Sequence, residues 1–194
     1  MPFTQQDRGF NAITRTAAQT RVLDAALELI VEHGVSGTSL QMIADAMGVT
    51  KAAVYRQFKT KEEIVIAITE REMGRLEDAL EAAEAQGHPL RAREVLLDRM
   101  IEQAIDRRGA YSIPMFDPVI IRLQAQHEPF QSFIERLYAA LLGTEAGVEA
   151  RLHAAMLSSA ISVAVMHPLI ADVDGDTLRA YLKEMTRRMI GLTQ

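Results

Sequence analysis

Side chains able to recognise nucleic acid gather between residues 41 and 61 of this chain. Lysine and arginine can donate to guanine or to a phosphate, and glutamine matches the donor and acceptor that adenine presents in the major groove. Alanine can offer only apolar contact, for instance to the methyl group of thymine. The candidates are Lys51, Ala52, Ala53, Tyr55, Arg56 and Gln57. These residue types suit the reading of double-stranded DNA.

Two short helices around a tight turn would present most of these side chains together. Ser39 is suited to cap a helix from about Leu40 to Met47, and Thr50 to cap a second from Lys51 to about Gln57. Gly48 lies between them, where the backbone must reverse and a positive φ is favoured. This is the layout of a helix-turn-helix, whose second helix enters the major groove.

The apolar residues of this segment have the spacing needed to bury one side of it. Ala44 faces the neighbouring helix, where a small side chain allows a close crossing. We predict a small core, shared with the preceding helix, from Ile43, Met47, Val49, Val54 and Phe58. The outer side of the second helix is then left to Lys51, Ala52, Ala53, Tyr55, Arg56 and Gln57. The alternative is a half-buried Tyr55 beside an ordinary solvated face of Lys51, Arg56, Lys59 and Lys61.

The rest of the chain also predicts helices, so the fold class is all-α. Apolar residues recur at helical spacing, and no segment alternates in the manner of a strand. A helix from about Thr16 to His33 should end at Gly34, and a capping box at Thr60–Glu63 should open a long helix to about Ala85. Further helices are expected at about 90–108, 119–126, 129–142, 148–166 and 177–190, with an irregular or broken stretch at 109–118.

Charge and composition limit the possible partners. The net charge is −5, yet residues 1–61 hold seven Lys or Arg and five Asp or Glu, so only the first third is mildly basic. The absence of cysteine excludes disulfides and thiolate metal sites. Residues 1–11 have no apolar stretch, which favours a cytoplasmic rather than a secreted protein. Residues 152–171 carry no charge and could span a bilayer, but their His, Ser and Pro favour a buried helix instead.

From Arg21 to about Glu70 the chain resembles the DNA-binding domain of TetR-type transcriptional regulators. The matching pieces, in order, are 25–30 with Gly34, Ile43-Ala44, Gly48-Val49-Thr50, Val54-Tyr55, Phe58 and 61–64. The resemblance implies a three-helix DNA-binding domain at residues 1–62, with an arm at 1–15. It also implies a helical ligand-binding and dimerisation domain at 63–194.

The resemblance assigns roles to matching positions. Tyr55 and Lys61 match positions that usually touch phosphates. The positions that commonly face bases or nearby phosphates are matched by Gln41, Lys51, Ala52, Ala53, Arg56 and Gln57. Arg8 and Arg15 of the arm could add a phosphate or minor-groove contact. The implied protein is a homodimeric repressor that binds a near-palindromic operator and is released by a small-molecule effector. No catalytic residue, cofactor, metal site or membrane contact is expected.

The second half supports the dimer through its own residues. The 148–166 segment is apolar nearly all round, with small residues such as Ala154 and Ala155 that would let a second helix approach. The 177–190 segment carries one apolar stripe. We expect the dimer to form through these two helices, the alternative being a core within one chain. Candidates to line a ligand pocket are Met100, Tyr111, Met115, Phe116, Phe130, Phe133, Tyr138, Met156, His153 and His167, with Asp117 as a further polar residue.

Two other classes of function compete with this interpretation. An enzyme is disfavoured because the chain has no HExxH, GxGxxG, Walker or GxSxG motif. A helical ligand-binding or scaffolding protein with a vestigial helix-turn-helix is disfavoured by the surface of Lys51, Tyr55, Arg56 and Lys61. Activation instead of repression stays open on the sequence alone.

Overall fold

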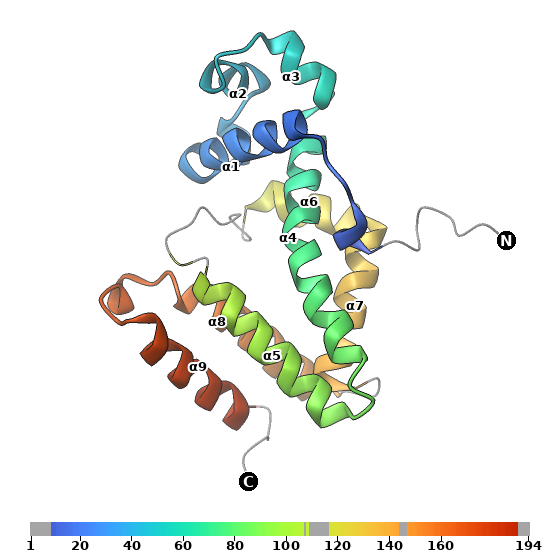
Figure 1. The fold of residues 1–194 in the computed structure, drawn as a ribbon, viewed down its shortest axis with the longest axis vertical. Coiled ribbons are helices and arrows are strands. Elements are labelled where there is room, and N and C mark those ends of the chain that lie inside the picture. Colours follow the sequence, from blue (N-terminus) through green and yellow to red (C-terminus); the bar gives the residue numbers. More distant parts are fainter. Residues whose placement is uncertain (1–8, 107, 109–116, 144–146, 190–194) are drawn as a thin grey trace, which may run out of the picture. The chain divides into compact units, whose positions relative to one another are not determined.

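The computed structural model describes residues 9–106, 108, 117–143 and 147–189, and these residues form helices without strands (Figure 1). In chain order the elements are η2 (Phe10–Ala12), α1 (Ala17–Gly37), α2 (Leu40–Ala46), α3 (Lys51–Gln57), α4 (Lys61–Glu84), α5 (Pro89–Asp106), α6 (Pro118–Gln126), α7 (Glu128–Leu142), α8 (Val148–Ala164), η3 (Pro168–Ile170) and α9 (Gly175–Met189). The predicted all-α class is confirmed. Most of the stretch expected to be irregular, 109–116, lies outside the described residues.

Two compact units divide these helices. One comprises residues 1–75 and 111–132, and the other residues 76–110 and 133–194. The division falls inside α4 and inside α7. The domain boundary expected after residue 62 falls near the start of α4, and it stays a prediction.

Side-chain caps begin the helices of the first unit where the sequence predicts them. The Ser39 hydroxyl accepts a hydrogen bond from the Met42 amide, and that of Thr50 accepts one from the Ala53 amide, both at 3.2 Å. Each cap satisfies an amide that has no partner within its own helix. These predicted starts of α2 and α3 are confirmed.

The capping box at the start of α4 is only half formed. The Glu63 amide donates to the Thr60 hydroxyl at 3.1 Å, as expected. The Glu63 carboxylate, however, accepts from the amide of Lys59 at 2.7 Å, one residue before the expected partner. The sequence correctly located the helix start but not the second bond, because the Lys59 amide lies beyond the end of α3 and competes for the carboxylate.

The core of the first unit joins α1, α2, α3, the first part of α4, and α6. Ile43, Ala44 and Val54 are fully buried, Phe58 is nearly so, and Met47 and Val49 pack against them. Gly48 has a φ of 65°, which a side chain would disfavour. The predicted core of the helix-turn-helix is therefore confirmed. Val22, Leu23 and Ile30 of α1 and Ile64 and Ile68 of α4 complete it.

Helix α1 does not end at Gly34 as predicted. Gly34 has a φ of 71° and a ψ of 166°, so the helical path breaks there, but a further helical turn continues at residues 35–37. The glycine signal correctly located the break. The additional turn could not be predicted from local sequence, because its backbone partners are Asp117 and Lys61, far away in the chain.

The N-terminal arm lies directly against α4. A Cβ atom at Gly74 would approach the backbone of Phe10 and Asn11 to 3.2–3.3 Å, closer than side chains ordinarily pack. Phe10 itself is buried. The missing side chain at Gly74 thus allows the main chain of the arm to rest on the helix.

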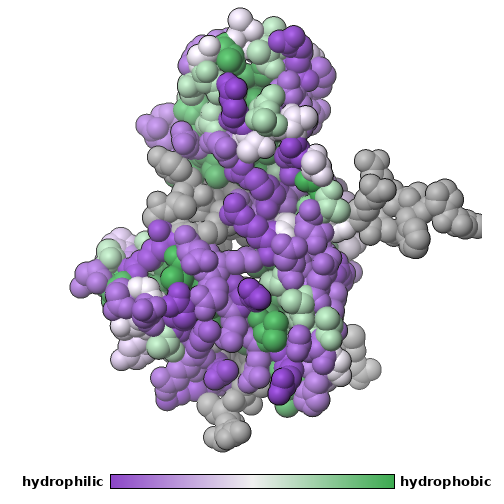
Figure 2. Space-filling view, in the orientation of Figure 1, coloured by the Kyte–Doolittle hydropathy of each residue, from purple (hydrophilic) through white to green (hydrophobic). Residues whose placement is uncertain are grey.

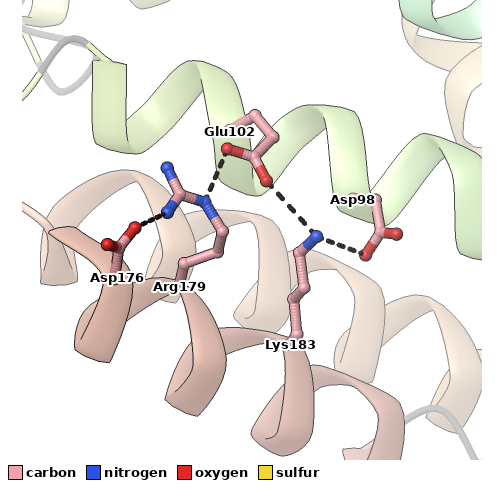
Figure 3. A network of polar contacts seen from close by, with 5 residues as sticks. All are labelled: Asp98, Glu102, Asp176, Arg179 and Lys183. Carbon is pink, nitrogen blue, oxygen red and sulfur yellow. Dashed lines mark hydrogen bonds and ion pairs between the residues drawn. The ribbon is translucent and has the colours of Figure 1, made fainter.

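Charged side chains connect α9 to α5 in the second unit (Figure 3). Arg179 Nε lies 2.8 Å from Glu102 Oε2, and Lys183 Nζ lies 3.3 Å from Glu102 Oε1 and 3.5 Å from Asp98 Oδ1. Arg179 also binds Asp176 on its own helix. The hydrogen bond from Arg179 lowers the pKa of Glu102. We call this set of five residues the α5–α9 ladder.

Helix α8 contributes Ala154, Leu157 and Ile161 to the buried side chains of the second unit, and Val165 follows the helix end. The segment that raised the question of a membrane span covers much of this helix. None of the helices within the described residues combines the length and the apolar character that a bilayer crossing requires.

Candidate nucleic-acid interface

Helix α3 carries the predicted recognition residues on the side away from the core. Lys51, Ala52 and Arg56 are exposed, and Tyr55 keeps 50% of its surface accessible. Because residues four apart share a helix face, Lys51 lies above Tyr55 and Ala52 above Arg56. Buried Val54 anchors the opposite side of the helix. Ala53 and Gln57 are partly buried or at the edge of the exposed face.

Lys59 is a cation of this surface that sequence reasoning did not include among the recognition residues. Its Nζ lies 4.7 Å from the centre of the Tyr55 ring and donates to the Tyr55 carbonyl at 3.2 Å. An ammonium over an aromatic face is attracted by the ring, and here it also lies near the phenol that is expected to meet a phosphate. The four-residue spacing between Tyr55 and Lys59 could have predicted this contact. Because α3 ends between the two residues, however, helical spacing did not place Lys59 on the same face.

Lys61 is held by the polypeptide itself. Its Nζ donates to the carbonyl of Val35 at 2.7 Å and to that of Thr38 at 2.9 Å. An ammonium has three donors, so one is left for another acceptor. The phosphate contact expected of Lys61 stays a prediction, and it would have to use that remaining donor or replace one of these bonds.

Gln41 is oriented by a neighbour on α2. Its side-chain amide donates to Asp45 Oδ1 at 2.7 Å, which fixes the direction of the amide group. A two-bond contact with adenine needs the donor and the acceptor of glutamine aligned together with the base edge. Reading of adenine by Gln41 would therefore compete with the bond to Asp45.

Arg15 of the arm is paired within the protein. Arg15 Nη2 lies 2.7 Å from Glu70 Oε2, and its side chain is only 12% exposed. Burial lowers the pKa of Arg15, and the charge of Glu70 opposes that effect. The expected contribution of Arg15 to a phosphate or minor-groove contact stays a prediction, and it would compete with the bond to Glu70. Arg8 lies outside the described residues.

The candidates for a ligand pocket fall in several places. Met100 and Phe133 are buried in the second unit, where Tyr138 is partly buried. Phe130 lines a cavity of about 10 Å³ in the first unit, with room for about one water molecule.

The remaining pocket candidates lie at the surface or beyond the described residues. Met156 is 62% exposed and His153 is exposed, both on α8. His167 is also exposed, and its Nδ1 accepts from the Leu169 amide to cap η3. Tyr111, Met115 and Phe116 are outside the described residues. The single ligand pocket predicted from this set stays a prediction.

Among the described residues, no group of three or more His, Asp or Glu is arranged to hold a metal ion. The surface around α3 instead offers donors and cations: Lys51, Tyr55 and Arg56 on the helix, with Lys59 and Lys61 just after it. Such a set can bind phosphates and the edges of bases.

Comparison with known proteins places this surface in a familiar context. The family model "Bacterial regulatory proteins, tetR family" matches residues 22–68, which span most of α1, all of α2 and α3, and the start of α4. The HTH-type transcriptional regulator AcrR of Shigella flexneri is 37% identical over 94 residues, which are 46% of this chain and 43% of AcrR. The match thus spans less than half the length of this curated relative.

Solved structures extend the likeness to the whole fold. NalD, the secondary repressor of the MexAB-OprM multidrug efflux pump in Pseudomonas aeruginosa, is 26% identical, with a TM-score of 0.64 over 89% of this chain and 96% of its own. The transcriptional regulator FadR of Bacillus subtilis, solved in complex with stearoyl-CoA, is 18% identical, with a TM-score of 0.66 over 90% of this chain and 99% of its own. At that identity the second likeness concerns the fold alone.

Proposed function

Because this chain belongs to the TetR family of bacterial regulatory proteins, we propose that it is a DNA-binding transcriptional regulator acting in the cytoplasm. One observation carries the proposal: the segment that matches the family folds around a buried core and leaves a row of donors and cations exposed on α3. Repression is the action we propose, as in the relative NalD.

Base contacts and phosphate contacts fall to different residues in this proposal. Lys51 and Arg56 on the exposed face of α3 are the base readers, and either can bind guanine through two hydrogen bonds or a charged contact. Tyr55, Lys59 and Lys61 lie along the edge of that face and bind the phosphates beside the groove. Phosphate contacts fix the register of the protein on the duplex, whereas base contacts supply the specificity.

A second copy of the chain is the partner that fits the second unit. Among the described side chains, the exposed large apolar residues of α8 are Val148, Leu152 and Met156, spaced four residues apart, and those of α9 are Tyr181, Met185 and Met189, spaced in the same way. Each set forms one stripe along its helix. Figure 2 shows hydrophobic side chains reaching the surface among hydrophilic ones in the region of α9.

The α5–α9 ladder explains why the stripe on α9 faces outward. Arg179 and Lys183 bind α5, and Leu178, Leu182 and Thr186 are buried, so the remaining side of α9 is left for a partner. Binding to two successive major grooves on one face of DNA would require such a dimer to hold two copies of α3 about 34 Å apart. The operator is then a near-palindrome.

We further propose that a small-molecule effector releases the dimer from DNA. The candidates Met100, Phe133 and Tyr138 of the second unit are apolar or aromatic, which favours an apolar effector. Such an effector acts by preferring the conformation that binds DNA less well. The proposal assigns no catalytic step and no cofactor.

Selection from a random duplex pool tests the function directly. The wild-type chain should enrich a near-palindrome, and fluorescence anisotropy at several salt concentrations should then show two subunits per site and a steep salt dependence. A variant with Lys51→Gln and Arg56→Gln should lose the preference for that sequence. The matched control, Arg91→Gln with Arg99→Gln, removes two exposed cations from α5 and should bind as the wild type does. Weak binding that is equal for all duplexes would refute a sequence-specific regulator.

A further inference from the structure

The turn between α1 and α2 has backbone groups that are hydrogen-bonded by side chains from distant parts of the chain. Gly34 breaks the helical path with a φ of 71°, and one more helical turn continues at residues 35–37. The Val35 amide therefore starts a new turn and finds no carbonyl one turn earlier along a continuous helix. Val35 is 1% exposed, so water cannot easily serve that amide. We call residues 34–38 the clamped turn.

Asp117 supplies the missing acceptor from 82 residues away. Its Oδ2 accepts from the Val35 amide at 3.0 Å, and its Oδ1 accepts from the Val119 amide at 2.8 Å. The second bond caps the N-terminus of α6, which begins at the next residue. One carboxylate thus joins two helical N-termini, where its negative charge is favourable. A Cβ at Gly34 would lie 3.7 Å from Asp117 Oδ2, so the carboxylate rests against the bare face of the glycine.

Lys61 holds the other end of the clamped turn. Its ammonium binds the carbonyls of Val35 and Thr38, while the Thr38 hydroxyl donates to the Gly34 carbonyl at 2.9 Å. A carboxylate therefore lies at the amide end of the turn and an ammonium at its carbonyl end. This matches the direction of the turn's dipole.

The clamped turn leads directly into the helix-turn-helix. Thr38 is 2% exposed, and the next residue, Ser39, is the N-cap of α2. Since α2 packs on α3 through the buried Ile43, Ala44 and Val54, the position of the turn sets the position of both helices. A displacement of the start of α6 would be passed on to them through Asp117.

We propose that Asp117 is a positioning residue for DNA binding, which acts through the Val35 amide and the clamped turn and does not itself touch DNA. The inference rests on the proposed function. It adds Asp117, which is not among the residues proposed to contact DNA. Sequence reasoning had suggested Asp117 as a polar group for a ligand. Both of its carboxylate oxygens are instead used by backbone amides of the protein.

Asp117→Ser separates the two bonds. Serine still caps a helix, but its side chain is one atom shorter and cannot reach across to Val35. The operator dissociation constant should rise about tenfold, as expected when a charge-assisted hydrogen bond that orders the site is lost. The salt dependence should be unchanged, because no phosphate contact is removed. The Val35 amide should exchange with solvent deuterium at least about ten times faster, because its acceptor is gone.

Two further variants separate positioning from general stability. Asp174→Ser removes a carboxylate that accepts from the Thr177 amide at 2.9 Å and so caps α9 in the other unit. This matched control should leave operator affinity unchanged. Asp117→Asn keeps the shape with one acceptor oxygen and should fall between the wild type and Asp117→Ser in both measurements.

The possible outcomes distinguish the inference from the function on which it rests. If Asp117→Ser binds the operator as the wild type does while the Val35 amide exchanges faster, the positioning role is wrong. It is also wrong if Asp174→Ser loses as much affinity, or if Val35 exchange does not change. If the wild-type chain selects no duplex, the proposed function itself fails and the positioning role with it, whereas Val35 exchange still reports whether the Asp117 bond forms.

Discussion

Lys59 and Lys61 lie two residues apart, yet they bind different parts of the molecule. Lys59 covers the ring of exposed Tyr55, while Lys61 is fastened to the carbonyls of Val35 and Thr38. Residue type and the family resemblance assigned Lys61 to a phosphate but could not reveal its internal partners, because these come from a turn more than twenty residues away. The same limit applies to Arg15, whose partner Glu70 is 55 residues distant. Local spacing predicts which residues are exposed on α3, but not which cations are already paired.

The two lysines should therefore differ in how they affect stability. Lys59→Gln should weaken binding to all duplexes and lower the salt slope by about one per subunit, with little change in the melting temperature. Lys61→Met should also lower the melting temperature, because two carbonyls lose a donor whose bonds contribute about 1 kcal/mol or more. Anisotropy titrations and thermal unfolding of both variants make the comparison. Equal melting temperatures would contradict the internal role of Lys61.

Arg56 offers a second test at the residue scale. If Arg56 reads a base, Arg56→Ala should relax the preference at one position in each half-site, at a cost of about 1–3 kcal/mol in discrimination. Repeating the duplex selection with the variant measures this directly. A uniform loss across all sequences, together with a smaller salt slope, would instead make Arg56 a phosphate contact.

At the scale of elements, the residues where helices start were easier to predict than the distant residues that bind those helices. The hydroxyls of Ser39 and Thr50 bind amides within three residues, so the sequence contains both halves of each bond. The turn after Gly34 depends on Asp117 and Lys61, and no local pattern includes either. Likewise, the periodicity of α9 predicted an apolar stripe. It did not predict that Arg179 and Lys183 on the polar side of α9 bind α5, because their acidic partners are about 80 residues earlier in the chain.

The α5–α9 ladder should make the second unit sensitive to acid. The bond from Arg179 lowers the pKa of Glu102 below its ordinary value of 4.5. A carboxylate with a lowered pKa in the folded state stabilises that state above the unfolded pKa, and the contribution is lost as the pH falls through the folded value. Wild-type melting temperature should therefore decline below about pH 4.5.

A variant isolates this effect from other carboxylates. Glu102→Gln should have a lower melting temperature than the wild type at pH 7. Between about pH 5 and about pH 3 it should lose less stability than the wild type, because it has no carboxylate at this position to protonate. Glu128→Gln, at the start of α7, is the control and should follow the wild-type profile. Parallel profiles for Glu102→Gln and the wild type would show that the ladder does not contribute.

At the scale of the whole molecule, the two units present surfaces of opposite character. The first exposes donors and cations on α3, and the second exposes apolar stripes on α8 and α9. This division accords with the charge distribution along the chain, in which only the first third carries a positive balance. In the proposed dimer, DNA binding would depend on association, since a single helix-turn-helix reads only one half-site.

Charge placed in the apolar stripes should therefore impair DNA binding indirectly. Met156→Glu with Tyr181→Glu should yield a monomer in sedimentation, because two carboxylates would be buried without partners in the dimer. Operator affinity should fall while binding to a single half-site changes little. Leu169→Glu introduces a similar charge at a residue 83% exposed on η3 and should remain dimeric. A dimer that persists in the double variant would place the interface elsewhere.

The main chain of residues 10 and 11 shields the backbone of α4 from water at Gly74. Residues 11–14 are themselves exposed, so a protease that cut there would release this cover. Fraying of α4 would then begin in its middle, at a residue whose own side chain offers no protection, rather than at its ends. The packing of the arm on Gly74 thus protects the middle of α4, the longest helix among the described residues.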